Sequence, residues 1–181
     1  MVFLCLDIYK EYVIRPVISI FISNLNITIN YMKNIFTQEV SNEIITRINS
    51  LTKDTQPQWG KMSVAQMLAH CNVTYELVYE QKHAKPNPFV KFILKTFVKK
   101  LVTNDKPYKQ CSQTAPYFVI SEAKEFENEK ARLIAYIEKT QTLGESHFDG
   151  KESHSFGKMN KQEWNAMFWK HLDHHLKQFN A

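Results

Sequence analysis

The hydrophobic and polar positions near the end of the chain repeat with the period of an α-helix over residues 160–179. At about 100° per residue, Trp164, Phe168, His171 and His175 share one face of this predicted helix. Leu or Ile is usual on such a face, because a buried imidazole leaves two ring nitrogens in need of partners. One metal ion bound by both histidines is the simplest partner, and the four-residue spacing suits it. The alternative is an ordinary polar helix face, since isolated pairs with this spacing are common.

A second helix has a clear start signal near residue 63. Ser63 and Gln66 form a capping box, so the sequence predicts a helix from Val64 onward. His70 lies at the edge of the apolar face of this helix. By itself, His70 is equally well explained as a hydrogen-bonded boundary residue. Together with the C-terminal pair, it would complete three imidazole ligands around an open metal site.

Three further apolar repeats predict helices, and the expected fold class is therefore all-α. They cover residues 37–51, 87–101 and 126–144. Residues 104–116 form a polar connection, and residues 145–160 are expected to be a loop that leads into the last helix. Five helices fit a four-helix bundle with one accessory helix.

The positive charge of the chain is concentrated near its middle. The formal net charge is +5, and much of the excess comes from Lys91, Lys95, Lys99 and Lys100, which flank phenylalanines with helical spacing. A basic amphipathic helix can lie on a membrane or follow phosphates. The commoner explanation is a bundle helix with a solvated lysine face, and we adopt it. No nucleic-acid-binding module accompanies this helix, so we expect neither a nucleic acid nor a membrane as a partner.

Residues 1–31 differ from the rest of the chain, because they contain many apolar residues but these follow neither a helical nor an alternating period. The longest apolar run is about six residues, short of the roughly 18 that span a bilayer, and charges interrupt any signal-peptide pattern. We interpret residues 1–31 as an N-terminal extension, with translation starting at Met32, and residues 32–181 as the domain. The alternative is a genuine N-terminal strand or helix that packs on the domain.

The cysteine and glycine content narrows the class of protein. Three scattered cysteines, Cys5, Cys71 and Cys111, suit a reducing cytoplasm better than a disulfide scaffold. The four glycines are too far apart for a phosphate-binding loop. Cys71 follows His70 directly, about 100° around the helix, and is expected to pack in the core rather than bind metal.

Three segments resemble a branch of the DinB-like, YfiT-like superfamily of metal-dependent proteins, a branch that has no settled activity. They are Trp59–Cys71, His154–Gly157 and Glu163–Phe179, and the resemblance extends over residues 32–181. It implies a four-helix bundle in which one histidine of an early helix and an H-x-x-x-H pair of a late helix hold a divalent metal. These ligands correspond to His70, His171 and His175. The chain departs from many relatives at Ser155, where they have proline.

Two more histidines are candidate catalytic residues. His154 lies in the loop that enters the last helix, and His174 borders the ligand face. Either could act as an acid or a base, and the alternative for both is a surface or loop-structuring role. Asp173 lies opposite the ligand face and is expected to be solvated. No H-E-x-x-H motif is present, so a metalloprotease lacks its general base.

These features predict a cytoplasmic protein that binds a divalent metal and acts on a small molecule. Zinc or nickel is expected first, and manganese or iron second. Superfamily relatives include thiol-dependent S-transferases, which implies a low-molecular-weight thiol as substrate; hydrolysis by metal-bound hydroxide is the competing chemistry. A different class is also open, namely a non-catalytic, metal-stabilised helical bundle that binds a small ligand or a protein partner. Homodimer formation stays open as well.

Overall fold

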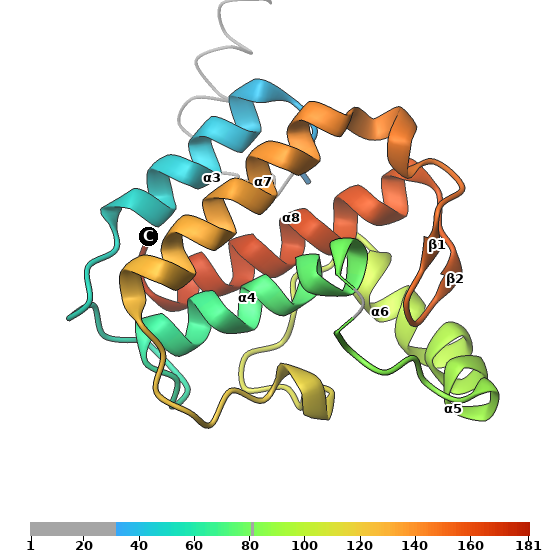
Figure 1. Cartoon of the computed structure of the whole chain (residues 1–181), viewed down its shortest axis with the longest axis horizontal. Helices are drawn as coiled ribbons and strands as arrows, with labels where there is room; N and C mark the ends of the chain where they lie inside the picture. The colour runs from blue at the N-terminus through green and yellow to red at the C-terminus, as the bar shows by residue number, and fades with distance from the viewer. Residues whose placement is uncertain (1–31, 81) are drawn as a thin grey trace, which may run out of the picture. The chain divides into compact units, whose positions relative to one another are not determined.

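Four long helices build the part of the chain that the structure describes. The computed structural model describes residues 32–80 and 82–181, so the expectation of an extension at residues 1–31 lies outside the described residues. The four helices pack against one another (Figure 1), and they are α3 (Gln38–Ser50), α4 (Val64–Tyr79), α7 (Phe126–Phe148) and α8 (Lys161–Gln178). The expected all-α class is confirmed for these residues, apart from a two-stranded hairpin.

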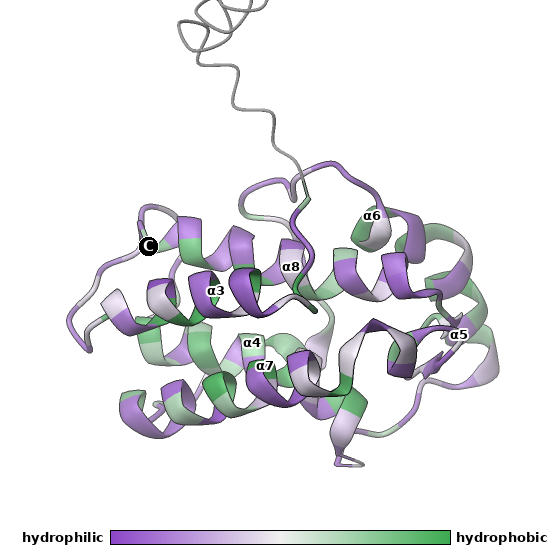
Figure 2. Ribbon diagram, turned by 90° about the horizontal axis from the view of Figure 1, so that it is seen from above, coloured by the Kyte–Doolittle hydropathy of each residue, from purple (hydrophilic) through white to green (hydrophobic). Residues whose placement is uncertain are grey.

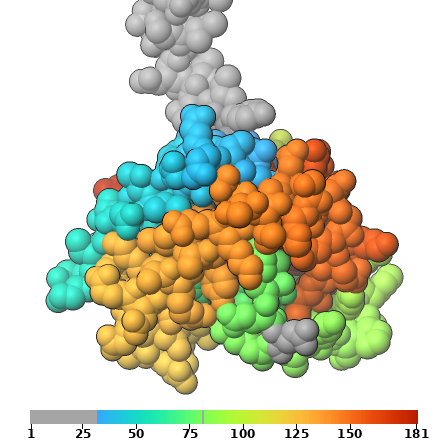
Figure 3. Space-filling model, turned by 45° about the horizontal axis from the view of Figure 1, so that its top comes forward, coloured from blue at the N-terminus to red at the C-terminus, as the bar shows by residue number. Residues whose placement is uncertain are grey.

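The helices meet through their apolar faces, as the periodicity predicted. Space-filling atoms of α3 and α7 lie side by side on one face of the domain (Figure 3). Tyr75 of α4 stacks on Phe168 of α8 with ring centroids 5.0 Å apart. Each large side chain buried in this way contributes about 1.5–3 kcal/mol. The core side chains that are almost fully buried include Ile44, Ile48, Leu68, Tyr75, Leu133, Ile137, Trp164 and Phe168.

The predicted helix starts are confirmed by their capping hydrogen bonds. At α4, the Ser63 hydroxyl accepts from the backbone N–H of Gln66, and the Gln66 side chain accepts from the backbone N–H of Ser63. Asn160 and Glu163 make the same reciprocal pair at α8. Such caps are worth about 0.5–2 kcal/mol each, and they determine where the two histidine-bearing helices begin.

The end of α7 and the following loop differ from the prediction. Gly144 adopts φ 71° and interrupts the helix at the expected place, but one more helical turn continues to Phe148. Phe148 is fully buried and stacks on Phe36, with ring centroids 5.1 Å apart, which explains why the turn persists. A short antiparallel hairpin of β1 (Glu152–Ser153) and β2 (Gly157–Lys158) then leads to α8.

The basic helix is not an ordinary bundle helix, and our interpretation of it is wrong. It consists of α5 (Pro88–Ile93), a π-helical turn η2 (Leu94–Val98) and α6 (Lys99–Thr103), and none of its residues is buried. Its most exposed apolar residues have 63–72% of their surface accessible; they are Phe89, Phe92, Phe97 and Leu101. The segment touches the body through α6, which packs on α8. The predicted apolar face therefore points away from the core.

Within the described part of the chain, no helix combines the length and the hydrophobicity needed to cross a membrane.

Candidate metal centre

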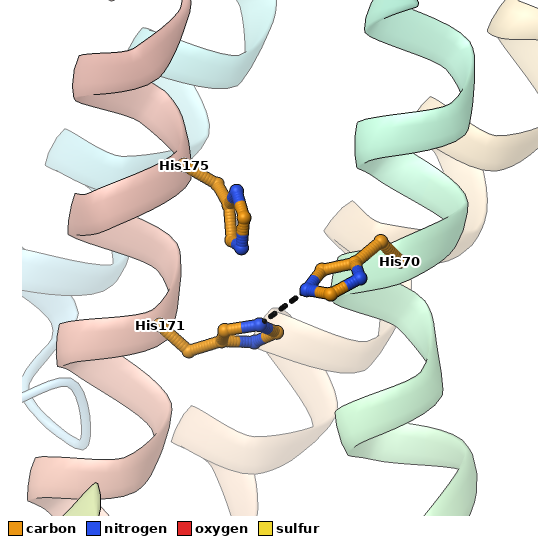
Figure 4. Close-up of side chains that lie close together, drawn as sticks. All are labelled: His70, His171 and His175. Atoms are coloured by element: carbon orange, nitrogen blue, oxygen red, sulfur yellow. Dashed lines mark hydrogen bonds between the residues drawn. The ribbon is translucent and has the colours of Figure 1, made fainter. Parts of the chain in front are cut away.

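Three histidines converge between α4 and α8. His70 extends from α4, and His171 and His175 extend toward it from successive turns of α8 (Figure 4). One ring nitrogen of each histidine lies within 4.8 Å of the corresponding nitrogens of the other two. The closest pair is Nε2 of His70 and Nε2 of His171, 2.9 Å apart. Among the described residues, no carboxylate or thiol joins this group.

Hydrogen bonds outside the cluster determine which nitrogen of two rings faces inward. Nδ1 of His70 lies 2.8 Å from the backbone carbonyl oxygen of Phe118, which can only accept, so Nδ1 carries the proton. Nδ1 of His175 lies 2.8 Å from the side-chain oxygen of Gln178. The Gln178 amide donates to the carbonyl of Trp59 at 2.7 Å, which orients its oxygen toward His175. In both neutral rings Nε2 therefore keeps its lone pair.

The third ring, His171, has a partner that suits either tautomer. Its Nδ1 lies 2.9 Å from the Thr74 hydroxyl, which can donate or accept. In the structure, Nε2 of His171 must be the donor to His70, because Nε2 of His70 is unprotonated. If the proton moves to Nδ1, the Thr74 oxygen accepts a hydrogen bond from the Nδ1–H, and Nε2 of His171 is also unprotonated. The same site can then present three Nε2 lone pairs.

Burial keeps these rings neutral. Desolvation is the main cause that lowers the pKa of His70, places that of His171 well below its ordinary value and brings that of His175 to about 3. The neighbouring imidazoles lower the pKa of His171 and His175 further, whereas the bond to Phe118 opposes the shift at His70. Neutral imidazole is the form that binds metal. The protonation state near pH 7 therefore suits metal binding.

The cluster opens into a cavity of about 940 Å³. All three histidines line it, together with aromatic residues from three separate segments, Trp59, Tyr108, Tyr117 and Phe118. No aspartate or glutamate is among its lining residues in the described chain, whereas Lys61, Lys106 and Lys109 are. A small molecule in this cavity would reach the histidines in surroundings that favour negative charge.

His154 and His174 line the same cavity but lie outside the three-histidine group. The ring of His174 lies 5.0 Å from that of His175 and also contacts Trp59 and Tyr108, with centroids 5.8 and 5.7 Å away. Burial lowers the pKa of both His174 and His154. Both residues are therefore placed where a cavity ligand could meet them.

The position of His154 is set by two weak polar contacts. Its Nδ1 lies 3.2 Å from the Ser155 hydroxyl, and its Nε2 lies 3.4 Å from the carbonyl oxygen of His83. The Tyr117 hydroxyl lies 3.3 Å from the same Ser155 oxygen. Ser155 thus links His154 to Tyr117, an aromatic residue of the cavity wall.

The structure contradicts the expectation for Asp173 and confirms the one for Cys71. Asp173 is not solvated as expected, because α3 covers that side of α8 and places Arg47 3.0 Å from its carboxylate. Cys71 is buried in the core with its sulfur 3.8 Å from that of Met67, so the expectation that it packs there is confirmed. Burial also raises the pKa of the Cys71 thiol, which disfavours the thiolate that binds metal.

Three residues that hydrogen-bond to the histidines were not predicted from the sequence: Thr74, Gln178 and Phe118. Thr74 lies four residues after His70 and Gln178 lies three residues after His175, so helical spacing alone could have indicated both. Phe118 contributes a backbone carbonyl from the 3₁₀ turn η3 (Pro116–Phe118). Because any residue type offers that carbonyl, no sequence signal marks it.

Comparison with known proteins identifies one family. The family described as "Protein of unknown function (DUF1569)" matches residues 33–181, a range that includes the three clustered histidines and both cavity-wall histidines. No curated protein and no solved structure matches the chain.

Proposed function

The chain belongs to the DUF1569 family of unknown function, and we propose that it is a metal-dependent enzyme of the DinB-like superfamily. In this proposal, α3, α4, α7 and α8 form the four-helix bundle of that superfamily. His70, His171 and His175 hold one divalent ion, with zinc or nickel expected first. The substrate is a small molecule that occupies the cavity.

The observation that carries this proposal is the shared arrangement of the three rings. In each ring, Nδ1 has an oxygen partner outside the cluster, 2.8–2.9 Å away. Nε2 is unprotonated in His70 and His175, and it can become unprotonated in His171. Metal-binding histidines typically donate their second N–H to such a partner, which fixes the ring and raises its basicity. A buried histidine needs a partner at Nδ1 with or without a metal, so what favours a metal is that the inward-facing nitrogens of the three supported rings lie within 4.8 Å of one another.

The number of ligands favours an enzyme over a metal-stabilised bundle. Structural zinc sites almost always have four protein ligands, whereas catalytic sites have three and leave a position open. Three ligand residues are present among the described residues, and the cavity adjoins them. A bound divalent ion would supply a Lewis acid with an open position on the cavity side.

The cavity favours a thiol that carries negative charge. Thiolates are preferred ligands of zinc, and carboxylates of a low-molecular-weight thiol would be attracted by Lys61, Lys106 and Lys109 on a wall that lacks acidic residues. The aromatic side chains would exclude water and contact an apolar electrophile. We therefore propose S-transfer as the reaction, in line with the superfamily resemblance.

Two histidines are assigned roles in that reaction. Because burial lowers its pKa, His174 is neutral near pH 7 and can accept the proton that the thiol releases. His154, held by Ser155 and the His83 carbonyl, would orient a polar group of the substrate. Neither role requires contact with the metal.

The test combines metal analysis with an activity screen. Purified protein is reconstituted with zinc, nickel, manganese or iron, its metal content is measured, and consumption of a carboxylate-bearing thiol is followed with an aromatic electrophile. Stoichiometric metal and thiol consumption that is lost in His171→Ala are the expected results. Ester cleavage without a thiol would replace S-transfer by hydrolysis. Bound metal with no exchangeable coordination position would indicate a non-catalytic bundle, and the absence of stoichiometric metal would refute the site.

A further inference from the structure

The segment Pro88–Thr103 exposes its phenylalanines, whereas Leu94, Val98 and Val102 are partly buried. Polar contacts also anchor the segment to the body. On the inner side, Lys91 pairs with Glu152 at 2.8 Å and Lys99 pairs with Glu163 at 2.8 Å. Buried Lys170 of α8 donates to the carbonyls of Leu101 and Asn104 at the end of α6. These contacts attach the segment to the body while its phenylalanines stay exposed.

The π-helical turn keeps the exposed phenylalanines along one side. Phe92 and Phe97 are five residues apart, which is the hydrogen-bonding interval of a π-helix, and Phe97 lies within η2. Phe89 precedes Phe92 by three residues, the spacing of neighbours on an α-helix. Figure 2 shows hydrophobic and hydrophilic residues interspersed along α5 and α6, at one end of the domain. Aromatic side chains at least 63% exposed on one helix are unusual for a surface that faces only water.

The charge around these phenylalanines indicates which partner fits. Residues 85–109 contain seven lysines and a single acidic residue, Asp105. Lys95 and Lys100 are exposed and belong to the segment that carries the phenylalanines. A second copy of the chain would bring the same positive surface into contact with itself, and like charges oppose that association. An anionic surface that also accepts apolar side chains is complementary.

We propose that Pro88–Thr103 is a docking surface for an anionic lipid membrane. The helix would lie in the interface with Phe89, Phe92 and Phe97 inserted among the acyl chains and with lysines near the phosphates, as interfacial amphipathic helices do. This revises our expectation that no membrane is a partner. It does not depend on the metal centre.

The experiment measures binding of the full chain to vesicles. Co-sedimentation is compared between vesicles of pure phosphatidylcholine and vesicles of equal parts phosphatidylcholine and phosphatidylglycerol, at low and high salt. We expect binding to the anionic vesicles that weakens with salt. The variant Lys95→Glu/Lys100→Glu should reduce the partition coefficient by about 25-fold or more, because each lysine charge removed near the surface costs about fivefold.

The second variant removes the apolar contribution and keeps every charge. Phe89→Ser/Phe92→Ser/Phe97→Ser should reduce binding by at least about tenfold, and it should fold because the three side chains are exposed. Far-ultraviolet circular dichroism checks the fold. The matched control is Lys33→Glu/Lys53→Glu, which changes the charge equally at exposed lysines near α3 and should bind as the original chain does.

Three outcomes would overturn the proposal. The first is no binding to anionic vesicles, and the second is binding that persists in both the lysine and the phenylalanine variants, because it would then come from another part of the chain. The third is a dimer in light scattering that the phenylalanine variant dissociates, which would make the surface an interface between copies. If the phenylalanine variant does not fold, the lysine variant and its control decide alone.

Discussion

Replacing Gln178 by leucine should weaken metal binding without removing any ligand. The Gln178 oxygen accepts the Nδ1–H of His175 at 2.8 Å, and both residues are buried. Gln178→Leu keeps most of the side-chain volume but leaves that N–H without its acceptor. An unsatisfied buried donor costs about 1–3 kcal/mol. The proton can then move to Nε2, the nitrogen that should bind metal.

The expected loss of zinc affinity follows from this cost. A penalty of about 1–3 kcal/mol corresponds to roughly 5- to 150-fold in a dissociation constant, and loss of a partner behind a metal-bound histidine typically costs about 10- to 100-fold. We therefore expect the dissociation constant for zinc to rise by about one to two orders of magnitude. His175→Ala should raise it further, because that variant removes a ligand.

The assay is a competition titration of zinc against a chromophoric chelator, with circular dichroism to check the fold. Gln113→Leu is the matched control, because Gln113 also lines the cavity but is exposed and lies outside the histidine hydrogen bonds. An unchanged zinc affinity in Gln178→Leu would refute the idea that Gln178 orients His175. A similar loss in Gln113→Leu would show that the effect is not specific to this hydrogen bond.

Four further predictions address the same site. Replacing His70, His171 or His175 by alanine should each reduce metal affinity at least about tenfold, and undiminished zinc content by mass spectrometry in all three variants would remove the assignment. His154→Ala should lower thiol consumption more than zinc content, whereas equal losses would make it a ligand. Gly60→Ala should weaken zinc binding, because its Cβ would lie 2.7 Å from the amide nitrogen of Gln178 and its φ of +83° strains alanine; an unchanged titration would show that the amide adapts. Because the pKa of His175 is about 3 in the folded protein and about 6.5 in an unfolded chain, the unfolded chain binds more protons between these values. The melting temperature of the metal-free protein should therefore fall as the pH decreases from about 6.5 toward 3, and a constant melting temperature would contradict this.

Local sequence signals were sufficient to predict where the two helices that carry the site begin. The capping boxes of Ser63 and Asn160 involve residues three apart, so their hydrogen bonds form within one turn and depend on little else. The shared face of His171 and His175 likewise follows from helical geometry alone. The glycine that interrupts α7 was also recognisable, because its positive φ is costly for other residues.

Contacts between distant segments had to come from the tertiary structure. His70 lies 101 residues from His171 and 48 residues from the carbonyl of Phe118, and no local pattern encodes which helix faces pack together. The same holds for Asp173, whose solvation depended on where α3 places Arg47.

The basic helix shows most clearly why the sequence alone does not determine which side of a helix is buried. An amphipathic pattern states which side of a helix is apolar, and the sequence alone determined that much for residues 88–103. Whether that side is buried depends on the surface that the rest of the chain offers to it. Here ion pairs and buried Lys170 attach the segment to the body, and Leu94, Val98 and Val102 are partly buried. The tertiary structure therefore decided that the phenylalanines face outward.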